Sequence, residues 1–332
     1  MAVQTAPAAT HRILGLARSP QDLARFGVII ALAALILFGW LRYDNFVSQF
    51  NAVTFFRYNS MFALIALGMC FVIITGGIDL SVGGTAALAS VVAALASPYG
   101  IAAGVTAGVG TGLAVGLLNA IIITRLKIPP FIATLAAMLA AYGCALLLSG
   151  QQSISASYAS GFTEFGQGDF LNFPIPGWVT IIAFIAGWAV LEHSALGRRI
   201  LAIGGGEDAA RLMGLNVDRL KAGVYLASGG LAGLSGVILA AQFGAGQPTE
   251  GVGWELFAIA SVVVGGTLLT GGVGSVGATL AGALLLAMVF NILNFENGLG
   301  WISLSAYWQS VIRGGFLLLV VILQAKITRR AN

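Results

Sequence analysis

The chain has 332 residues, of which 58% are hydrophobic and only 8% are charged, and its 16 Lys and Arg outnumber its 12 Asp and Glu. A soluble globular domain of ordinary composition carries about 25% charged residues, so this chain is expected to lie mostly within a membrane. No cluster of basic and aromatic residues indicates nucleic-acid binding. The two cysteines and two histidines show no metal-ligand spacing, so no metal site is predicted.

The apolar segments predict about ten membrane-spanning helices, since one span needs roughly 20 apolar residues. In chain order they are expected near residues 26–41, 60–75, 85–98, 101–123, 131–149, 178–192, 222–243, 255–270, 275–295 and 306–325. Residues 26–325 would then form one all-α transmembrane domain, with tails at 1–25 and 326–332. Ten spans place both tails on one side of the membrane.

The basic residues indicate which side that is. Of the 16 Lys and Arg, 13 lie in four segments. These are the segment before the first helix, the segment after the last, the loop between helices four and five, and the loop between helices six and seven. All of these segments fall on one side of the ten-helix arrangement. Basic residues collect on the cytoplasmic side, so both termini are predicted to be cytoplasmic, as is the long polar segment 193–221.

A glycine-rich break separates the second and third predicted helices, at Thr75-Gly-Gly-Ile-Asp-Leu-Ser-Val-Gly-Gly84. Irregular backbone at membrane depth survives only where protein or a water-filled cavity surrounds it, and an intramembrane acid is a functional candidate. Asp79, Ser81 and, at similar depth on the fourth helix, Asn119 are therefore candidate pathway residues. A structural role is equally open, because Asp79 and Ser81 precede an apolar run as helix-capping residues do.

Glycines recur at two further kinds of place. A second break, Gly265–Gly277, separates helices eight and nine, and paired glycine breaks in the two halves of a transporter indicate its pathway. A pair of tight turns between short helices is the alternative. Two helices carry small-residue faces that predict close helix packing, namely Gly104, Gly108, Gly112 and Gly116 on one and Gly229, Gly230, Gly233 and Gly236 on the other.

Polar and aromatic residues near the outer ends of helices seven and nine suit an uncharged polyol, because amides bond hydroxyls and rings stack on sugar CH faces. These candidates are Gln242, Phe243, Asn291 and Asn294. Arg313 lies inside the tenth predicted helix and is a further candidate. It lines the pathway, pairs with Glu255 or Glu296, or extends its charge out of the membrane, and these alternatives stay open.

The segment 193–221 is predicted to contain a helix of about two turns at Glu207–Leu212. Acids at its start, Glu207 and Asp208, and a base at its end, Arg211, match the helix dipole. Ala209, Leu212 and Met213 are expected to face the cytoplasm, where they would dock a partner. A helix resting on lipid headgroups is the alternative.

The chain resembles the permease subunits of bacterial ABC sugar importers of the ribose, xylose and galactofuranose type over nearly its whole length. The motifs that carry the resemblance are Gly76-Gly-Ile-Asp-Leu-Ser-Val-Gly83, Gly116-Leu-Leu-Asn119, Lys127-Ile-Pro-Pro-Phe-Ile-Ala-Thr-Leu135, Gly197-Arg-Arg-Ile-Leu-Ala-Ile-Gly204, Ala209-Ala-Arg-Leu-Met-Gly-Leu215 and Ile259-Ala-Ser-Val-Val-Val-Gly-Gly-Thr267. The stretch from Gly251 to Gly274 is most similar to galactofuranose permeases.

The resemblance implies a subunit of the bacterial inner membrane that carries a pentose or hexose and is not itself an enzyme. It implies a cytoplasmic ATPase that holds ATP and Mg, a second permease subunit, identical or homologous, and a periplasmic sugar-binding protein. The segment from Glu207 to Met213 would be the element that couples to the ATPase. No Walker motif is present in this chain.

Two other functions are alternatives to this one. An ion-coupled secondary transporter would use Asp79 as its coupling carboxylate. A membrane enzyme acting on lipid-linked sugars would need clustered acids or metal ligands, whereas the acids here are isolated along the sequence.

Overall fold

The computed structural model describes residues 20–298, 308, 311–312 and 314–315. Its helices are α1 (Pro20–Arg42), α2 (Gln49–Ile74), α3 (Val82–Ala96), the 3-10 turn η1 (Ser97–Tyr99), α4 (Ile101–Thr124), α5 (Pro130–Ser149), α6 (Glu164–Gln167), α7 (Ile175–His193), α8 (Ala195–Gly205), α9 (Glu207–Leu212), α10 (Val217–Phe243), α11 (Trp254–Val264) and α12 (Val276–Gly298). Four two-residue strands complete it: β1 (Ile154–Ser155), β2 (Asp169–Phe170), β3 (Phe173–Pro174) and β4 (Ala245–Gly246).

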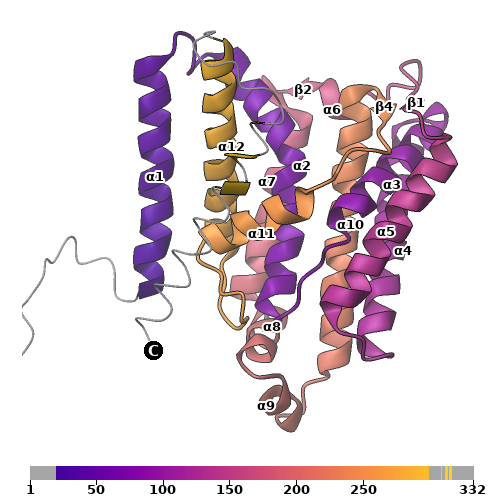
Figure 1. The fold of residues 1–332 in the computed structure, drawn as a ribbon, viewed down its shortest axis with the longest axis vertical. Helices are drawn as coiled ribbons and strands as arrows, with labels where there is room; N and C mark the ends of the chain where they lie inside the picture. The colour runs from indigo at the N-terminus through magenta and orange to yellow at the C-terminus, as the bar shows by residue number, and fades with distance from the viewer. Residues whose placement is uncertain (1–19, 299–307, 309–310, 313, 316–332) are drawn as a thin grey trace, which may run out of the picture.

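The long helices run up and down side by side, as a multi-pass membrane protein requires (Figure 1). Within the described ranges, seven helices are long and apolar enough to cross a membrane, and α1 and α11 contribute shorter apolar segments. Large apolar side chains such as Leu117 on α4, Leu139 on α5 and Ile182 on α7 are exposed on the outside of the bundle. Such a surface is stable only against lipid or another protein.

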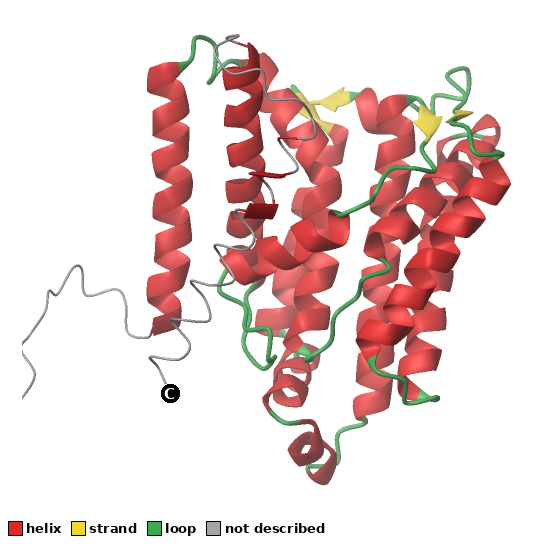
Figure 2. Ribbon diagram, in the orientation of Figure 1, coloured by secondary structure: helices red, strands yellow, loops and turns green. Residues whose placement is uncertain are grey.

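The arrangement agrees with the predicted topology. The start of α1, the end of α4 and the helices α8 and α9 lie at one end of the bundle, and the end of α10 and the strands lie at the other (Figure 1, Figure 2). The basic residues Arg125 and Lys127 follow α4, and Arg198 and Arg199 lie on α8. The end that holds α8 and α9 is therefore the cytoplasmic end.

Several helix bounds differ from those predicted. The helix expected at 60–75 begins at Gln49, because Ser48 caps it by accepting the Asn51 N–H (3.2 Å). The helix expected at 222–243 begins at Val217, capped in the same way by Asn216. The helix expected at 255–270 ends at Val264, since Gly265 and the left-handed Gly266 stop it. The helix expected at 306–325 lies largely outside the described residues.

Small strands were not predicted. β1 pairs with β4 and β2 pairs with β3, both antiparallel, at the end of the molecule opposite α8 and α9 (Figure 2). Each pair joins segments that lie next to helix ends, outside the helical core. The core is formed mainly by α2, α3 and α10, where α2 has buried residues on every face from Ala63 to Ile74.

The predicted close packing of two glycine faces is confirmed. A methyl group built on Gly112 of α4 would overlap the carbonyl oxygen of Gly229 on α10 and lie 2.7 Å from the Cα of Gly233. Gly116 meets the same helix at the backbone of Tyr225. Without side chains at these positions the two backbones reach contact, as small-residue faces allow in membrane helices.

The two glycine breaks also lie against each other. The first break follows α2 and the second lies between α11 and α12, and the Gly272 N–H of the second donates to the Ile74 oxygen at the end of α2 (2.9 Å). A methyl group on Gly271 would lie 2.8 Å from the Gly76 nitrogen. The positive φ of Gly272 (78°) also favours glycine there. The breaks therefore form one junction at the cytoplasmic end of the core.

Replacing Gly112 by Ala should destabilise the protein by about 1 to 3 kcal/mol, because the added methyl overpacks a backbone contact. Gly110→Ala, on the same helix, is the matched control, since a methyl group there meets no atom of a neighbouring element within 4 Å. Thermal unfolding of the purified variants in detergent measures both. Equal midpoints for the two variants would contradict the packing described here.

Candidate functional site

Asp79 is fully buried and accepts three hydrogen bonds. Its Oδ1 accepts from the backbone N–H of Ser81 (3.0 Å) and from the Ser81 hydroxyl (2.6 Å). Its Oδ2 accepts from the Ser228 hydroxyl on α10 (2.8 Å). The carboxylate thus joins the residues just before α3 to α10, and both of its oxygens have partners.

Asn119 and Thr134 complete the contacts of the first break. The Asn119 amide donates to the Ser81 hydroxyl (2.8 Å), so this residue reaches Asp79 through Ser81 rather than directly. The Thr134 hydroxyl of α5 accepts the Leu80 N–H (3.1 Å). Asp79 and Ser81 were expected to cap α3. Ser81 precedes α3 but its side chain makes no cap hydrogen bond, whereas the Asp79 carboxylate accepts the Ser81 N–H.

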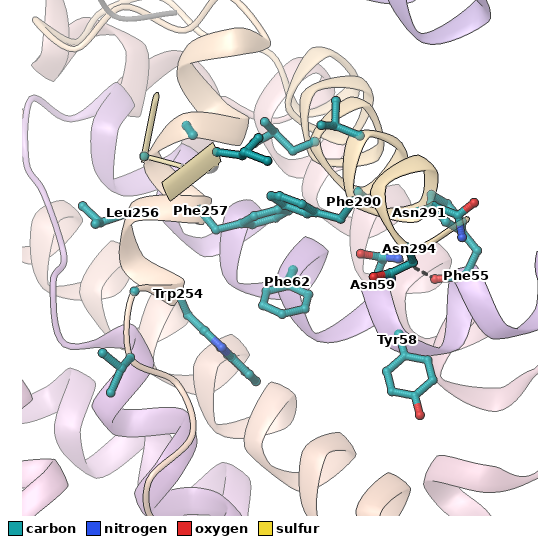
Figure 3. A pocket seen from close by; sticks show the side chains of 18 of the residues that line it. Phe55, Tyr58, Asn59, Phe62, Trp254, Leu256, Phe257, Phe290, Asn291 and Asn294 are labelled. Carbon is teal, nitrogen blue, oxygen red and sulfur yellow. Dashed lines mark hydrogen bonds between the residues drawn. The ribbon is translucent and has the colours of Figure 1, made fainter. Parts of the chain in front are cut away.

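A cavity of about 660 Å³ lies between α2, α11 and α12. Four rings form its aromatic side: Phe62 lies 4.7 Å from Trp254 and 4.9 Å from Phe257, and Phe257 lies 6.2 Å from Phe290, between ring centroids (Figure 3). The lining residues of the described chain include no charged side chain. The cavity therefore suits an uncharged ligand with apolar faces.

Amides gather at another part of the same cavity. Asn59, Asn291 and Asn294 lie near one another there (Figure 3). The Asn59 amide donates to the Phe55 oxygen (2.8 Å), which leaves its own carbonyl oxygen without a partner among the described residues. Asn291 exchanges hydrogen bonds with Asn51, at 3.1 and 3.4 Å. The cavity thus combines rings with neutral donors and acceptors.

The structure brings only some of the predicted outer residues to this cavity. Asn291 and Asn294 line it, whereas Gln242 is buried beside α6, where its backbone carbonyl oxygen accepts from the Gln167 side-chain amide (3.0 Å). Phe243 is exposed and its ring lies 6.1 Å from that of Tyr58, a lining residue. Arg313 lies outside the described residues. Glu296, one of its suggested partners, accepts from the Tyr43 hydroxyl (2.7 Å).

Sequence reasoning missed the contribution of α2 to the cavity. Phe55, Tyr58, Asn59 and Phe62 stand at positions i, i+3, i+4 and i+7, which is one face of a helix. This spacing is the signal that identifies them as one helix face. The helix was expected to begin at residue 60, which placed Phe55, Tyr58 and Asn59 in a loop.

The cytoplasmic segment folds as predicted at Glu207–Leu212, which is α9. Glu207 accepts from Arg211 (3.0 Å) and from Lys221, and Asp218 accepts from Arg211 (2.7 Å) and Lys127 (2.8 Å). Partial burial raises the pKa of Glu207, but the hydrogen bonds from Lys221 and Arg211 outweigh it and hold this pKa below its ordinary value. The ion pairs fix α9 against α10 and the loop after α4.

One face of this segment is apolar and exposed. Leu212 is 90% exposed and Met213 69% exposed, and Asp208 and Ala209 beside them are exposed as well. On the opposite face Ala210 is fully buried and packs with Ile203 and Val217. A short helix that packs through its buried face and shows apolar side chains at its tip has the form of a docking element.

The glycine junction contacts α8, the helix that precedes α9. Gly204, near the end of α8, packs so closely on the end of α2 and on the second break that a methyl group there would overlap the Ile74 oxygen and the Gly272 nitrogen. A methyl group on the next residue, Gly205, would meet no atom outside its own helix within 4 Å. The end of α8 is therefore in backbone contact with the end of α2 and with the second break. In the part of the chain that the structure describes, no group of three or more His, Cys, Asp or Glu could hold a metal ion.

Comparisons with known proteins agree with this arrangement. Residues 51–321 match the family described as branched-chain amino acid transport system, permease component. The ribose import permease RbsC of Bacillus subtilis is 39% identical over 305 residues, which cover 91% of this chain and 93% of the relative. No solved structure was found to match.

Two relatives from Escherichia coli add to this. Its RbsC is 39% identical over 307 residues (90% of this chain, 92% of the relative), and its L-arabinose transport system permease AraH is 36% identical over 304 residues (90% and 89%). Because the family match covers more than half of the chain and these relatives align over most of their length, the chain belongs to this family of transport-system permease components, which span the membrane several times.

Proposed function

We propose that this chain is the transmembrane permease subunit of an ATP-binding-cassette importer that carries a neutral monosaccharide across the bacterial inner membrane. The observation that carries the proposal is the cavity between α2, α11 and α12, where rings and amides meet without charge. The named relatives import ribose or L-arabinose, which makes a pentose the first sugar to test. Galactofuranose, suggested by the resemblance of residues 251–274, is the second.

The cavity matches a sugar in two ways. The rings of Phe62 and Phe257 offer faces for the CH groups of a pyranose or furanose, and the amides of Asn59, Asn291 and Asn294 offer donors and acceptors for its hydroxyls. A charged solute would lack a counter-charge there.

Phe257→Ala and Asn59→Leu should each reduce uptake of radiolabelled ribose or arabinose by about fivefold or more, because one removes a stacking face and the other the hydroxyl contacts. Cells lacking their own pentose permeases and carrying this protein with its partners provide the assay. Phe50→Ala is the control, since Phe50 is 81% exposed on α2. Wild-type uptake by both cavity variants would contradict the assignment.

The partners follow from the same proposal. A cytoplasmic ATPase would bind ATP and Mg, because this chain carries no Walker motif and is proposed to have no enzymatic activity of its own. A periplasmic sugar-binding protein would deliver the sugar, and a second permease subunit, identical or homologous, would complete the membrane unit. Glu207, Asp208, Ala209, Arg211, Leu212 and Met213 are proposed to form the ATPase contact.

Movement would pass from this contact to the pathway through the glycine junction. Ala210 of α9 is buried against Ile203 of α8, so a push on Leu212 would move α8 with it. The end of α8 touches the end of α2 and the second break at Gly204. Since α11 and α12 flank the second break and line the cavity, a displacement there changes the cavity directly.

Docking and transmission should be separable by mutation. Leu212→Asp should abolish co-purification of the ATPase, because a charge replaces the exposed apolar contact. Gly204→Ala should retain the ATPase but lose most ATP-driven uptake, since the methyl disturbs the junction, whereas Gly205→Ala should behave as wild type. Normal uptake by Gly204→Ala, or ATPase binding by Leu212→Asp, would contradict the proposed route.

Asp79 is proposed to hold the first break in shape rather than to bind the sugar. Both of its oxygens are occupied by donors from the protein, and its side chain is fully buried. Ser81 and Asn119 belong to the same network and share this role. An ion-coupled transporter would need Asp79 to exchange a proton or an ion, and its three existing hydrogen bonds would have to break for that to happen.

Asp79→Ala should lower the stability by about 3 kcal/mol or more, because it leaves the Ser81 N–H and the Ser228 hydroxyl without their acceptor. Asp79→Asn, which keeps one acceptor oxygen, should cost less. Yield and thermal unfolding in detergent measure this effect. A well-folded Asp79→Ala protein with wild-type stability and no uptake would instead assign Asp79 to the pathway.

A further inference from the structure

Two buried polar atoms near the cavity are not used by the proposed mechanism. Glu255 is the second residue of α11, and its Oε2 is buried without a hydrogen-bond partner in the described structure. Its neighbours Trp254 and Leu256 both line the aromatic cavity. Tyr142 on α5 has a hydroxyl that is likewise buried and without a partner there.

Glu255 Oε2 and the Tyr142 hydroxyl oxygen both lie beside the backbone contact between Gly83 and Gly251. Gly83, at the start of α3, and Gly251, before α11, touch so closely that a methyl group on either would overlap the other's carbonyl oxygen. The methyl on Gly83 would lie 2.9 Å from Glu255 Oε2, and that on Gly251 would lie 3.3 Å from the Tyr142 hydroxyl oxygen. Glu255 and Tyr142 therefore face the same place, where α3, α5 and α11 meet.

Glu255 differs from Asp79 in the hydrogen bonds that its carboxylate oxygens accept. A carboxylate that serves only the fold is expected to have its oxygens satisfied, as those of Asp79 are by three protein donors. The carboxylate of Glu255 lies beside the backbone amides of Gly253 and Glu255 at the start of α11, where the helix dipole favours a negative charge. Even so, Oε2 remains available for an outside donor.

The chemistry of the place suits sugar hydroxyls. Glu255 Oε2 accepts hydrogen bonds, the Tyr142 hydroxyl accepts and donates, and the Gly83 and Gly251 carbonyl oxygens lie beside them. No ion pair formed by described residues involves Glu255. An acceptor-rich site with one negative charge binds the hydroxyls of a neutral sugar and repels anions.

We propose that Glu255 and Tyr142 form a second binding site for hydroxyls on the translocation route, reached from the aromatic cavity around the start of α11. This inference rests on the proposed function and extends it. In the conformation observed here the contact between Gly83 and Gly251 closes the route beside this site. A sugar would pass when α3 and α11 separate, its hydroxyls donating to Glu255 Oε2 and bonding the Tyr142 hydroxyl as they do so.

The test uses the permease reconstituted with its ATPase and binding protein in proteoliposomes, with radiolabelled ribose or arabinose and ATP. Tyr142→Phe keeps the ring and removes only the hydroxyl, and Glu255→Leu removes the acceptor. Uptake should fall about tenfold in Glu255→Leu, less in Glu255→Gln, and severalfold in Tyr142→Phe. Glu250→Gln, an exposed acid before α11, should transport as wild type.

ATP hydrolysis stimulated by the sugar-loaded binding protein separates this role from a structural one. In the proposed site, hydrolysis continues while uptake falls, because only passage of the sugar is impaired. Parallel loss of hydrolysis and uptake in Tyr142→Phe would overturn the inference, and so would wild-type uptake by both Tyr142→Phe and Glu255→Gln. If Glu255→Leu does not fold, those two variants decide. A wild-type protein that carries no monosaccharide would refute the proposed function itself.

Discussion

The need to satisfy backbone polar groups inside the membrane determines the rest of this structure. At the first break the chain leaves the helix between α2 and α3, and lipid offers no partner for the exposed N–H and C=O groups. Asp79 and Thr134 supply acceptors for the N–H groups of Ser81 and Leu80, and the oxygen of Ile74 is taken up by Gly272. Irregular backbone is thereby kept in the core with its polar groups satisfied.

The same constraint explains why the breaks and the cytoplasmic helices are in contact. The Ile74 carbonyl oxygen at the end of α2 needs a donor, and the Gly272 N–H of the second break supplies it. The two backbones come this close because glycine carries no side chain. Gly204 brings the end of α8 to the same point. One junction therefore serves both the stability of the breaks and the proposed transmission of movement from α9 to the cavity.

Much of the fold could be predicted, because hydropathy, charge asymmetry and glycine spacing are local signals. The membrane topology, α9 and the packing of Gly112 on α10 followed from them. The site was harder to predict, since it depends on which helices meet. Asn291 and Asn294 line the cavity, whereas Gln242 packs beside α6, and nothing in the sequence shows that α6 covers it. The free oxygen of Glu255 is visible only in three dimensions.

ATP hydrolysis by a partner is proposed to drive a monosaccharide through this chain. Accumulation of labelled ribose or arabinose in proteoliposomes that hold the chain, an ATPase and a binding protein tests it most directly, with and without ATP on the cytoplasmic face and with a protonophore added. The account predicts accumulation that requires ATP and is unaffected by the protonophore. Accumulation that needs no ATP and collapses with the protonophore would contradict it and identify an ion-coupled transporter instead.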